Sequence, residues 1–241
     1  MINLENASFG YDDGFALSGI NLKINKGESL AVIGSNGSGK STLLKILCGI
    51  YFLKKGTYEF EGQQINEKSM RDRKFMKVFH KKIGFVFQNT DAQLFCPTVY
   101  EEIAFGPNQM KLDEKETNLR VADCLELLHI SHLADSKPYH LSEGEKKKVA
   151  IASVLAVNPD VIVLDEPMNN LDPRTKNFLK QLLLKLNKSG KTIICVTHDF
   201  QYTDGIFDRA AVLSEDHELI ADGNYSDIIN NKHLLESNNI L

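Results

Sequence analysis

The chain opens with short apolar runs that are interrupted by glycine and acidic residues, a pattern that predicts β-strands joined by turns. From Ile2 to Ile24 the main interruption falls at Asp12-Asp13-Gly14, which favours antiparallel strands. The next run, Leu30–Ile33, is wholly apolar, as expected for a strand that is buried on both faces. A glycine-rich turn follows it, and then a predicted helix from Ser41 to Cys48.

Helical periodicity replaces the strand pattern in the middle of the chain. Apolar residues recur at helical spacing in three segments, Tyr100–Phe105, Glu116–Leu128 and Glu143–Ala156. We therefore predict that residues 88–157 form a mostly helical subdomain. It is inserted between residues 1–87 and residues 158–241 of one continuous domain.

Apolar runs typical of strands lie on both sides of this insertion. Ile83–Phe87 precedes it, while Val161–Leu164 and Thr192–Val196 follow it and are separated by an amphipathic helix predicted at Arg174–Asn187. Strand–helix units of this kind predict a parallel sheet. The predicted fold class is therefore α/β, with an antiparallel β subdomain, a parallel-sheet core and an inserted helical subdomain.

The composition fits one globular domain without a membrane segment. The chain has 241 residues, 42% of them hydrophobic, which suffices for one buried core. A formal net charge of −4 argues against a dedicated nucleic-acid binder. Four scattered cysteines without a Cys-x-x-Cys pair suit buried thiols in a reducing cytosol. No leader peptide is expected after Met1, and no apolar run approaches the roughly 18 residues of a membrane helix.

One basic stretch, Lys68–Lys82, invites a nucleic-acid or membrane-surface interpretation. It carries Phe75, Val78 and Phe79 at helical spacing, however, with the basic residues between them. This arrangement favours a solvated amphipathic helix.

A phosphate-binding motif lies directly after the strand predicted at Leu30–Ile33 and directly before a helix. Its residues are Gly34, Ser35, Asn36, Gly37, Ser38, Gly39, Lys40 and Ser41, with Thr42 next in the chain. The glycines let backbone N–H groups surround phosphates, and the helix N-terminus adds a favourable dipole. We predict that Lys40 reaches the β- and γ-phosphates of ATP and that Ser41 binds Mg²⁺. The alternative, a glycine-rich turn with an exposed lysine, is disfavoured by the intact motif in this context.

Two adjacent carboxylates, Asp165 and Glu166, end the strand predicted at Val161–Leu164. An acidic residue at this point can hold Mg²⁺ beside a phosphate-binding loop. We assign the metal role to Asp165 and the role of general base to Glu166. Taken alone, the pair could instead cap the next helix or lie in solvent. Together with the phosphate-binding loop it favours a nucleotide site, of a kind that nucleotide kinases, helicases and GTPases also have.

A third motif distinguishes between these classes of nucleotide-binding protein. In Leu141-Ser142-Glu143-Gly144-Glu145, Ser142 and Glu145 form a capping box that starts a helix, and such a cap alone is the alternative to a binding role. The segment resembles the signature loop of the ABC (ATP-binding cassette) ATPases, which is Leu-Ser-Gly-Gly-Gln, and the resemblance covers almost the whole chain. It implies that Ser142 and Gly144 bind the γ-phosphate of ATP held by a second subunit. Glu143 and Glu145 depart from the family pattern.

Further family motifs occur in the expected order. Tyr11 matches the aromatic residue that stacks on adenine, although an aromatic residue in a strand is more often part of a core. Gln88 matches the glutamine that contacts Mg²⁺ and the attacking water. Asp172, in Asn170-Leu171-Asp172, matches a loop that crosses the dimer interface. His198 matches the histidine that senses the γ-phosphate. For each of the last three, a local structural role is the alternative.

The segment Gln88–Gly106 resembles the energy-coupling-factor (ECF) transporters and the cobalt/nickel importers within the family. The resemblance implies two ATPase subunits, identical or different, that drive a transmembrane coupling protein and a separate substrate-capture membrane protein from the cytoplasmic face of the cell membrane. The substrate is then a transition metal ion (cobalt or nickel) or a vitamin. A dimerisation extension, present in vitamin-type members, is expected to be missing after Leu241. Apolar residues at Leu94, Phe95, Tyr100, Ile103 and Phe105 predict the docking surface.

Two other functions are alternatives to transport. A non-transport ABC ATPase of DNA repair or ribosome work usually has a long coiled coil or two cassettes in one chain, and neither pattern occurs here. A soluble nucleotide kinase would need an acceptor site and a lid, and would lack the signature loop. Neither nucleic-acid binding nor a kinase reaction is therefore expected.

Overall fold

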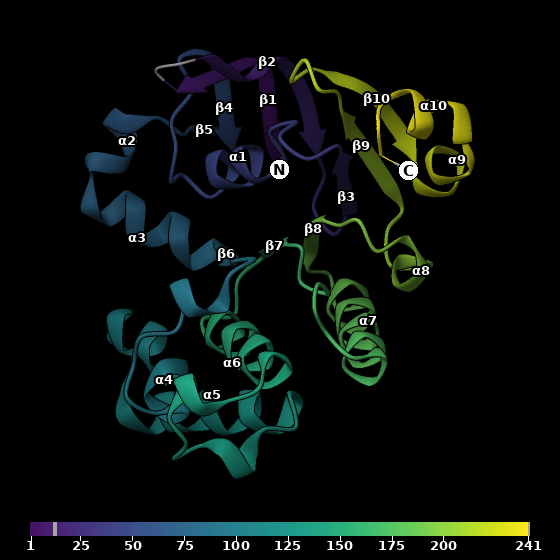
Figure 1. Cartoon of the computed structure of the whole chain (residues 1–241). Helices are drawn as coiled ribbons and strands as arrows, with labels where there is room; N and C mark the ends of the chain where they lie inside the picture. Colours follow the sequence, from purple (N-terminus) through teal and green to yellow (C-terminus); the bar gives the residue numbers. More distant parts are fainter. Residues whose placement is uncertain (12–13, 241) are drawn as a thin grey trace.

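The computed structural model describes residues 1–11 and 14–240, and within them the strands form two sheets (Figure 1). The smaller sheet has the order β2-β1-β4-β5, with antiparallel pairing between neighbours. Its strands are β1 (Ile2–Tyr11), β2 (Gly14–Ile24), β4 (Lys55–Phe60) and β5 (Gln63–Gln64). The antiparallel β subdomain predicted from the sequence is thus present. The turn expected at Asp12-Asp13, and Leu241, lie outside the described residues.

The larger sheet has the order β10-β9-β3-β8-β7-β6, in which only the pairing of β10 with β9 is antiparallel in the described part of the chain. Its strands are β3 (Ser29–Gly34), β6 (Ile83–Val86), β7 (Val161–Asp165), β8 (Thr192–Val196), β9 (Arg209–Leu213) and β10 (Leu219–Asn224). Every residue of β3, β7 and β8 is buried, as their apolar runs require. The predicted parallel core is confirmed, whereas β9 and β10 extend it beyond the prediction.

Helices cover both faces of this sheet. On one face, α1 (Lys40–Leu47) packs in a core shared with Leu30, Val32 and the antiparallel sheet. The other face, with Ala31 and Ile33, belongs to a core that continues into the helical subdomain. The remaining helices are α2 (Glu67–Arg71), α3 (Arg73–Lys82), α4 (Val99–Gln109), α5 (Glu114–Leu127), α6 (Glu143–Leu155), α7 (Pro173–Lys188), α8 (Phe200–Thr203), α9 (Tyr225–Asn230) and α10 (Lys232–Ser237).

The helical segment is set apart from the two sheets, with α4, α5 and α6 gathered at one end of the molecule (Figure 1). Short 3₁₀ turns at Thr90–Ala92, Ser131–Leu133 and Pro138–His140 connect its parts. No helix among the described residues is both long and apolar enough to cross a membrane.

The basic stretch Lys68–Lys82 differs from its prediction, because it forms two helices and not one. Asp72 interrupts it in an extended conformation, and its side chain caps α3 by accepting from the backbone N–H of Lys74. Phe79 is buried, but Val78 is 57% exposed. Helical spacing alone had assigned both side chains to the same apolar face.

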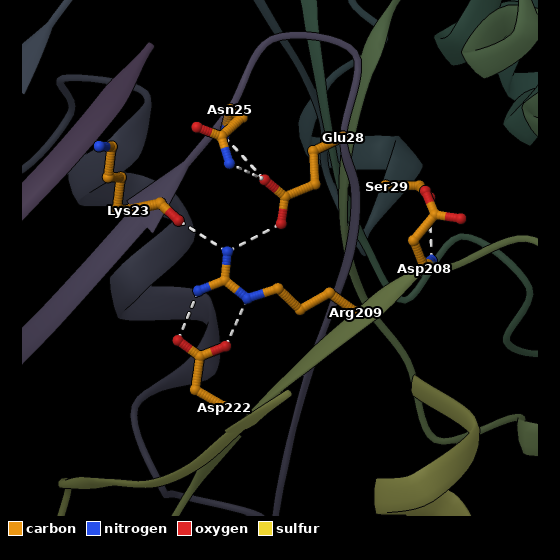
Figure 2. Close-up of polar contacts among 7 residues, drawn as sticks. All are labelled: Lys23, Asn25, Glu28, Ser29, Asp208, Arg209 and Asp222. Atoms are coloured by element: carbon orange, nitrogen blue, oxygen red, sulfur yellow. Dashed lines mark hydrogen bonds and ion pairs between the residues drawn. The ribbon is translucent and has the colours of Figure 1, made fainter. Parts of the chain in front are cut away.

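A polar cluster joins the two sheets near the start of β3 (Figure 2). Arg209, at the start of β9, forms a two-point contact with Asp222 of β10 and donates to Glu28 Oε1 at 2.8 Å. The same guanidinium donates to the carbonyl of Lys23 on β2 at 2.8 Å. The side chain of Arg209 therefore links β9 to β2, to β10 and to the residue that precedes β3.

Candidate functional site

The loop from Gly34 to Gly39 connects β3 to α1 and requires glycine at specific points. A Cβ atom at Gly39 would lie 2.1 Å from the carbonyl oxygen of Ala16, and one at Gly34 would lie 2.5 Å from that of Leu213. Gly39 also has a φ of 101°, which other residues rarely adopt. The backbone can thus turn tightly into the N-terminus of α1, where N–H groups can face an anion.

Lys40 lies across this loop. Its Nζ donates to the carbonyl oxygens of Gly34 at 2.8 Å and Ser35 at 2.7 Å. Burial lowers the pKa of Lys40, an effect that nearby Glu166 and Asp165 oppose. The ammonium is therefore held beside the loop, close to two carboxylates.

Asp165 ends β7 and is only 5% exposed. Burial raises the pKa of its carboxyl group, while a hydrogen bond from Ser41 and the charge of Lys45 counteract that rise. Its Oδ1 atom is buried and has no hydrogen-bond partner among the described residues. A buried carboxylate oxygen without a partner, next to a serine hydroxyl, suits a hard divalent cation such as Mg²⁺.

Glu166 is the residue on which several side chains converge. It has a φ of 44°, and its backbone N–H donates to the carbonyl of Val196 at 3.0 Å. Gln88 Nε2 donates to Glu166 Oε2 at 2.8 Å, and Asn169 Nδ2 also donates to that oxygen. His198 Nε2 lies 3.2 Å from Glu166 Oε1. Residues that follow β6, β7 and β8 thus meet at the same edge of the sheet.

His198 is held mainly in its neutral form. Burial lowers its pKa, and so does the nearby ammonium of Lys40, although Glu166 opposes both effects. Its Nε2 atom lies within ion-pair distance of Glu166 Oε1 but makes no hydrogen bond to the described residues. Gln88 therefore holds one oxygen of the Glu166 carboxylate by a hydrogen bond, and His198 lies beside the other oxygen.

Lys40, Gln88, Glu166 and His198 line a cavity of about 780 Å³, which Asp165 does not line. Tyr11, Ser41, Thr42 and most of the glycine-rich loop also line it. The ring of Tyr11 is 49% exposed, and its hydroxyl lies 3.3 Å from Thr42 Oγ1. Tyr11 packs edge-on against Phe9 and Tyr51. It is thus not part of the core, and its ring is accessible to a flat ligand.

The same cavity is also lined by residues that the sequence did not indicate, among them Asn169, His217 and Asn239. Asn169 lies three positions after Glu166, within the turn that follows β7. Its polar character in the predicted interface loop was the only signal available. His217 and Asn239 lie after Val196, in a part of the chain for which the periodicity predicted no helix or strand.

Ser142, Gly144 and Asp172 do not line this cavity in the described structure. Ser142 caps α6, and its Oγ donates to Glu145 Oε2 at 2.6 Å. Asp172 caps α7 and accepts from the backbone N–H of Arg174 and the hydroxyl of Thr175. A Cβ at Gly144 would lie 3.4 Å from Thr175 Oγ1, so the two caps are neighbours. The structure places these three residues together on a second surface.

Comparison with known proteins identifies this arrangement. A family model described as ABC transporter matches residues 17–169, which include the glycine-rich loop, the signature loop and Glu166. The chain belongs to the ABC transporter family. The family match supports the fold class predicted from the sequence and makes the chain an ATP-binding subunit.

Several curated proteins are similar to this ABC ATPase along its length. A putative ABC transporter ATP-binding protein of Clostridium acetobutylicum is 57% identical, over 100% of both chains. The nickel import ATP-binding protein LarO of Lactiplantibacillus plantarum is 42% identical, over 95% of both. The energy-coupling factor transporter ATP-binding protein EcfA of Carboxydothermus hydrogenoformans is 41% identical, over 99% of this chain and 86% of that protein.

Solved structures of ABC ATPases are also similar to this chain. The cbiO1 protein of Clostridium perfringens, described as part of the ABC transporter complex cbiONQ, has a TM-score of 0.84 and 38% identity, covering 99% of this ABC ATPase and 94% of that chain. A dimeric ATP-binding cassette in a post-hydrolysis state with ADP and phosphate has a TM-score of 0.84 and 33% identity. The match covers 93% of this chain and 98% of that chain.

Proposed function

We infer that this ABC ATPase energises an importer of the ECF type, for a transition metal ion such as cobalt or nickel or for a vitamin. The chain hydrolyses ATP, as ATP-binding subunits of such importers do. Similarity to a nickel import protein, to EcfA and to cbiO1 supports transport over the mechanical-module alternative, since each of these is named for transport. The observation that carries the ATPase function is the convergence of Gln88 and His198 on Glu166, opposite Lys40.

ATP fits the cavity with its phosphates at the glycine-rich loop and its adenine at Tyr11. Backbone N–H groups of the loop and Lys40 would hold the β- and γ-phosphates. The residues suited to hold Mg²⁺ are Asp165, Ser41 and Gln88. Bound Mg²⁺ neutralises negative charge on the phosphates. The unpartnered Oδ1 of Asp165 supports this assignment, since a buried carboxylate oxygen needs a partner.

Glu166 is the proposed general base. Water attacks the γ-phosphorus and the bond to the bridging β–γ oxygen breaks, which leaves ADP and inorganic phosphate. The proton of the water passes to the Glu166 carboxylate. Gln88 and His198 orient that carboxylate, and both can contact the γ-phosphate region of the cavity. Asn169 supports the same orientation by donating to Glu166.

Ser142, Gly144 and Asp172 are proposed to act on the ATP of a second subunit. They lie together at the N-termini of α6 and α7, away from the cavity that their own chain provides. Helix N-termini bind anions through free N–H groups and the helix dipole. A twofold arrangement of two cassettes would bring each such surface to the partner's cavity and form two composite sites.

The membrane partner is proposed to dock beside Gln88–Gly106. A groove of about 330 Å³ lies there, lined by Phe85, Phe87, Phe95, Phe105 and Val157 among others. Phe95 is 66% exposed and Phe105 42% exposed, with their rings 4.9 Å apart. Ile103 is fully buried and Tyr100 does not line the groove, so the predicted surface is narrower than the sequence suggested. Phe95 and Phe105 are the exposed anchors for an apolar helix.

Co-expression with an ECF-type transmembrane coupling protein tests this function. The complex is expected to co-purify in detergent, and Phe95→Glu is expected to prevent co-purification while ATP binding is retained. The matched control is Leu119→Glu, because Leu119 is an apolar residue of the same subdomain that is 56% exposed and lies outside the groove. Adding a capture protein in proteoliposomes then allows uptake of labelled Ni²⁺, Co²⁺ and vitamins to be compared. Association with ribosomes or DNA, without any membrane partner, would contradict the proposal.

A further inference from the structure

The backbone that carries Gln88 is attached to α6, the helix that the signature loop starts. Lys147 Nζ donates to the carbonyl oxygens of Phe87 at 3.1 Å and Gln88 at 2.9 Å. The side chain of Gln93 accepts from the N–H of Phe87 at 2.9 Å and donates to the carbonyl of Ala150 on α6 at 3.1 Å. The hydrogen bonds of Lys147 to Phe87 and Gln88, and of Gln93 to Ala150, thus attach this loop to α6.

Lys147 is an unusual member of this set because it is buried. Its exposure is 4%, whereas the side chain of Lys146, the preceding residue, is 12% exposed and forms an ion pair with Asp91 at 2.8 Å. Lysine is seldom buried unless its ammonium is paired, since desolvating the charge is costly. Burial lowers the pKa of Lys147, while Asp165, Glu143 and Glu166 oppose that change. Two of the three donors of the ammonium are used on the Gln88 loop.

The placement of Lys147 connects two parts of the composite site. Its backbone is in α6, whose N-terminus is Ser142, and its ammonium ends at Gln88. The amide of Gln88 in turn donates to Glu166 at 2.8 Å. A continuous chain of contacts therefore runs from the helix proposed to bind the partner's ATP to the general base of its own site.

We propose that Lys147 is a positioning residue that fixes the backbone of Gln88 on α6, so that a shift of the signature helix moves Gln88 relative to Glu166. This inference depends on the role proposed above for Gln88. Lys147 does not line the nucleotide cavity in the described structure, so it acts through Gln88 and not on ATP. Small displacements of an orienting group strongly reduce the rate of catalysis, so loss of the Lys147–Gln88 contact is expected to slow hydrolysis.

Steady-state ATP hydrolysis by three variants of the full chain tests the proposal. Lys147→Met keeps the length of the side chain but removes its donors, and is expected to lower kcat about 10-fold or more. KM is expected to stay within about twofold, since the phosphate contacts are untouched. Lys147→Gln restores a neutral donor and is expected to recover part of kcat. Lys115→Met, at an exposed lysine of α5, is the matched control and is expected to behave as wild type.

A double-mutant cycle separates positioning from a merely structural role. If Lys147 acts through Gln88, adding Lys147→Met to Gln88→Ala lowers kcat no further, because the affected group is already absent. Additive losses, or wild-type kcat in Lys147→Met, would overturn the inference. Wild-type kcat in Gln88→Ala would instead refute the role proposed for Gln88. Should Lys147→Met fail to fold, Lys147→Gln alone and in combination with Gln88→Ala provides the same cycle.

Discussion

Replacing Glu166 by glutamine is the most direct test of the chemistry inferred from the site. The side chain of Glu166 accepts from Gln88 and Asn169 through Oε2 and lies 3.2 Å from His198 Nε2 through Oε1. In Glu166→Gln, the amide oxygen can take the place of Oε2 and keep both of those donors. The amide nitrogen then faces His198, which can become an acceptor by moving its proton to Nδ1. The substitution therefore preserves the geometry while removing the base.

The expected loss follows from what is removed and what is retained. A positioned general base contributes about 10²–10⁴-fold in rate, which corresponds to about 2.7–5.4 kcal/mol at about 1.36 kcal/mol per tenfold change. The contacts of Lys40 with the glycine-rich loop are unchanged, so nucleotide binding is expected to persist. Removal of one negative charge from the phosphate end of the cavity also lowers the repulsion of ATP. The dissociation constant for ATP should thus stay equal or fall.

Phosphate release and equilibrium binding of a fluorescent ATP analogue measure the two quantities separately. Glu126→Gln is the matched control, since Glu126 is exposed on α5 and far from the cavity lining. Sedimentation of Glu166→Gln with and without ATP adds a third measurement, because blocked hydrolysis should retain the dimer. Turnover within about threefold of wild type would refute the reasoning, since loss of a general base costs far more. His198 would then be the next candidate for the base.

Three other substitutions test separate parts of the structure. Lys40→Ala removes a charged hydrogen-bonding group and should raise the ATP dissociation constant about 10- to 100-fold in a binding titration. A Cβ at Gly84 would lie 2.3 Å from Val154 Cγ1, so Gly84→Ala should lower the free energy of unfolding by about 1–3 kcal/mol in urea, and Val154→Ala in the same chain should restore part of it. Arg209→Met leaves Asp222 without its cation and should lower the free energy of unfolding by about 1–3 kcal/mol in the same assay. An unchanged dissociation constant or free energy of unfolding would contradict the role given to the contact that the substitution removes or disturbs.

The features that were predicted well are those encoded by neighbouring residues. The glycine-rich loop, the capping box of Ser142 with Glu145 and the buried strand that ends at Asp165 each depend on a few consecutive positions. Local sequence can specify them because helix caps and buried strands have strong short-range signals. The fold class then follows from the order of these elements.

Features that depend on distant contacts were not predicted. β9 and β10 pair at the edge of the core sheet, and only the partner strand determines that pairing. The buried ammonium of Lys147 belongs to a run of three lysines, and the sequence alone does not distinguish it from its two neighbours. Phe95 and Ile103 belong to one apolar segment, but Phe95 is exposed and Ile103 is buried. The sequence does not predict this difference, because it depends on which other parts of the fold pack against each side chain.

The departures from the family signature bear on how two cassettes would close around ATP. The Ser142 hydroxyl donates to Glu145 Oε2 at 2.6 Å, so its proton is already used within the loop. Hydrogen bonds from Ser142 lower the pKa of Glu145, which therefore carries a full negative charge at neutral pH. Glu143 adds a second carboxylate at the same helix N-terminus, where it is partly compensated by the helix dipole and by Lys146. An ATP γ-phosphate that approaches this loop meets two carboxylates where the family pattern has none. We therefore expect weaker ATP-driven association of two isolated chains, with the membrane partner supplying part of the energy that holds them together.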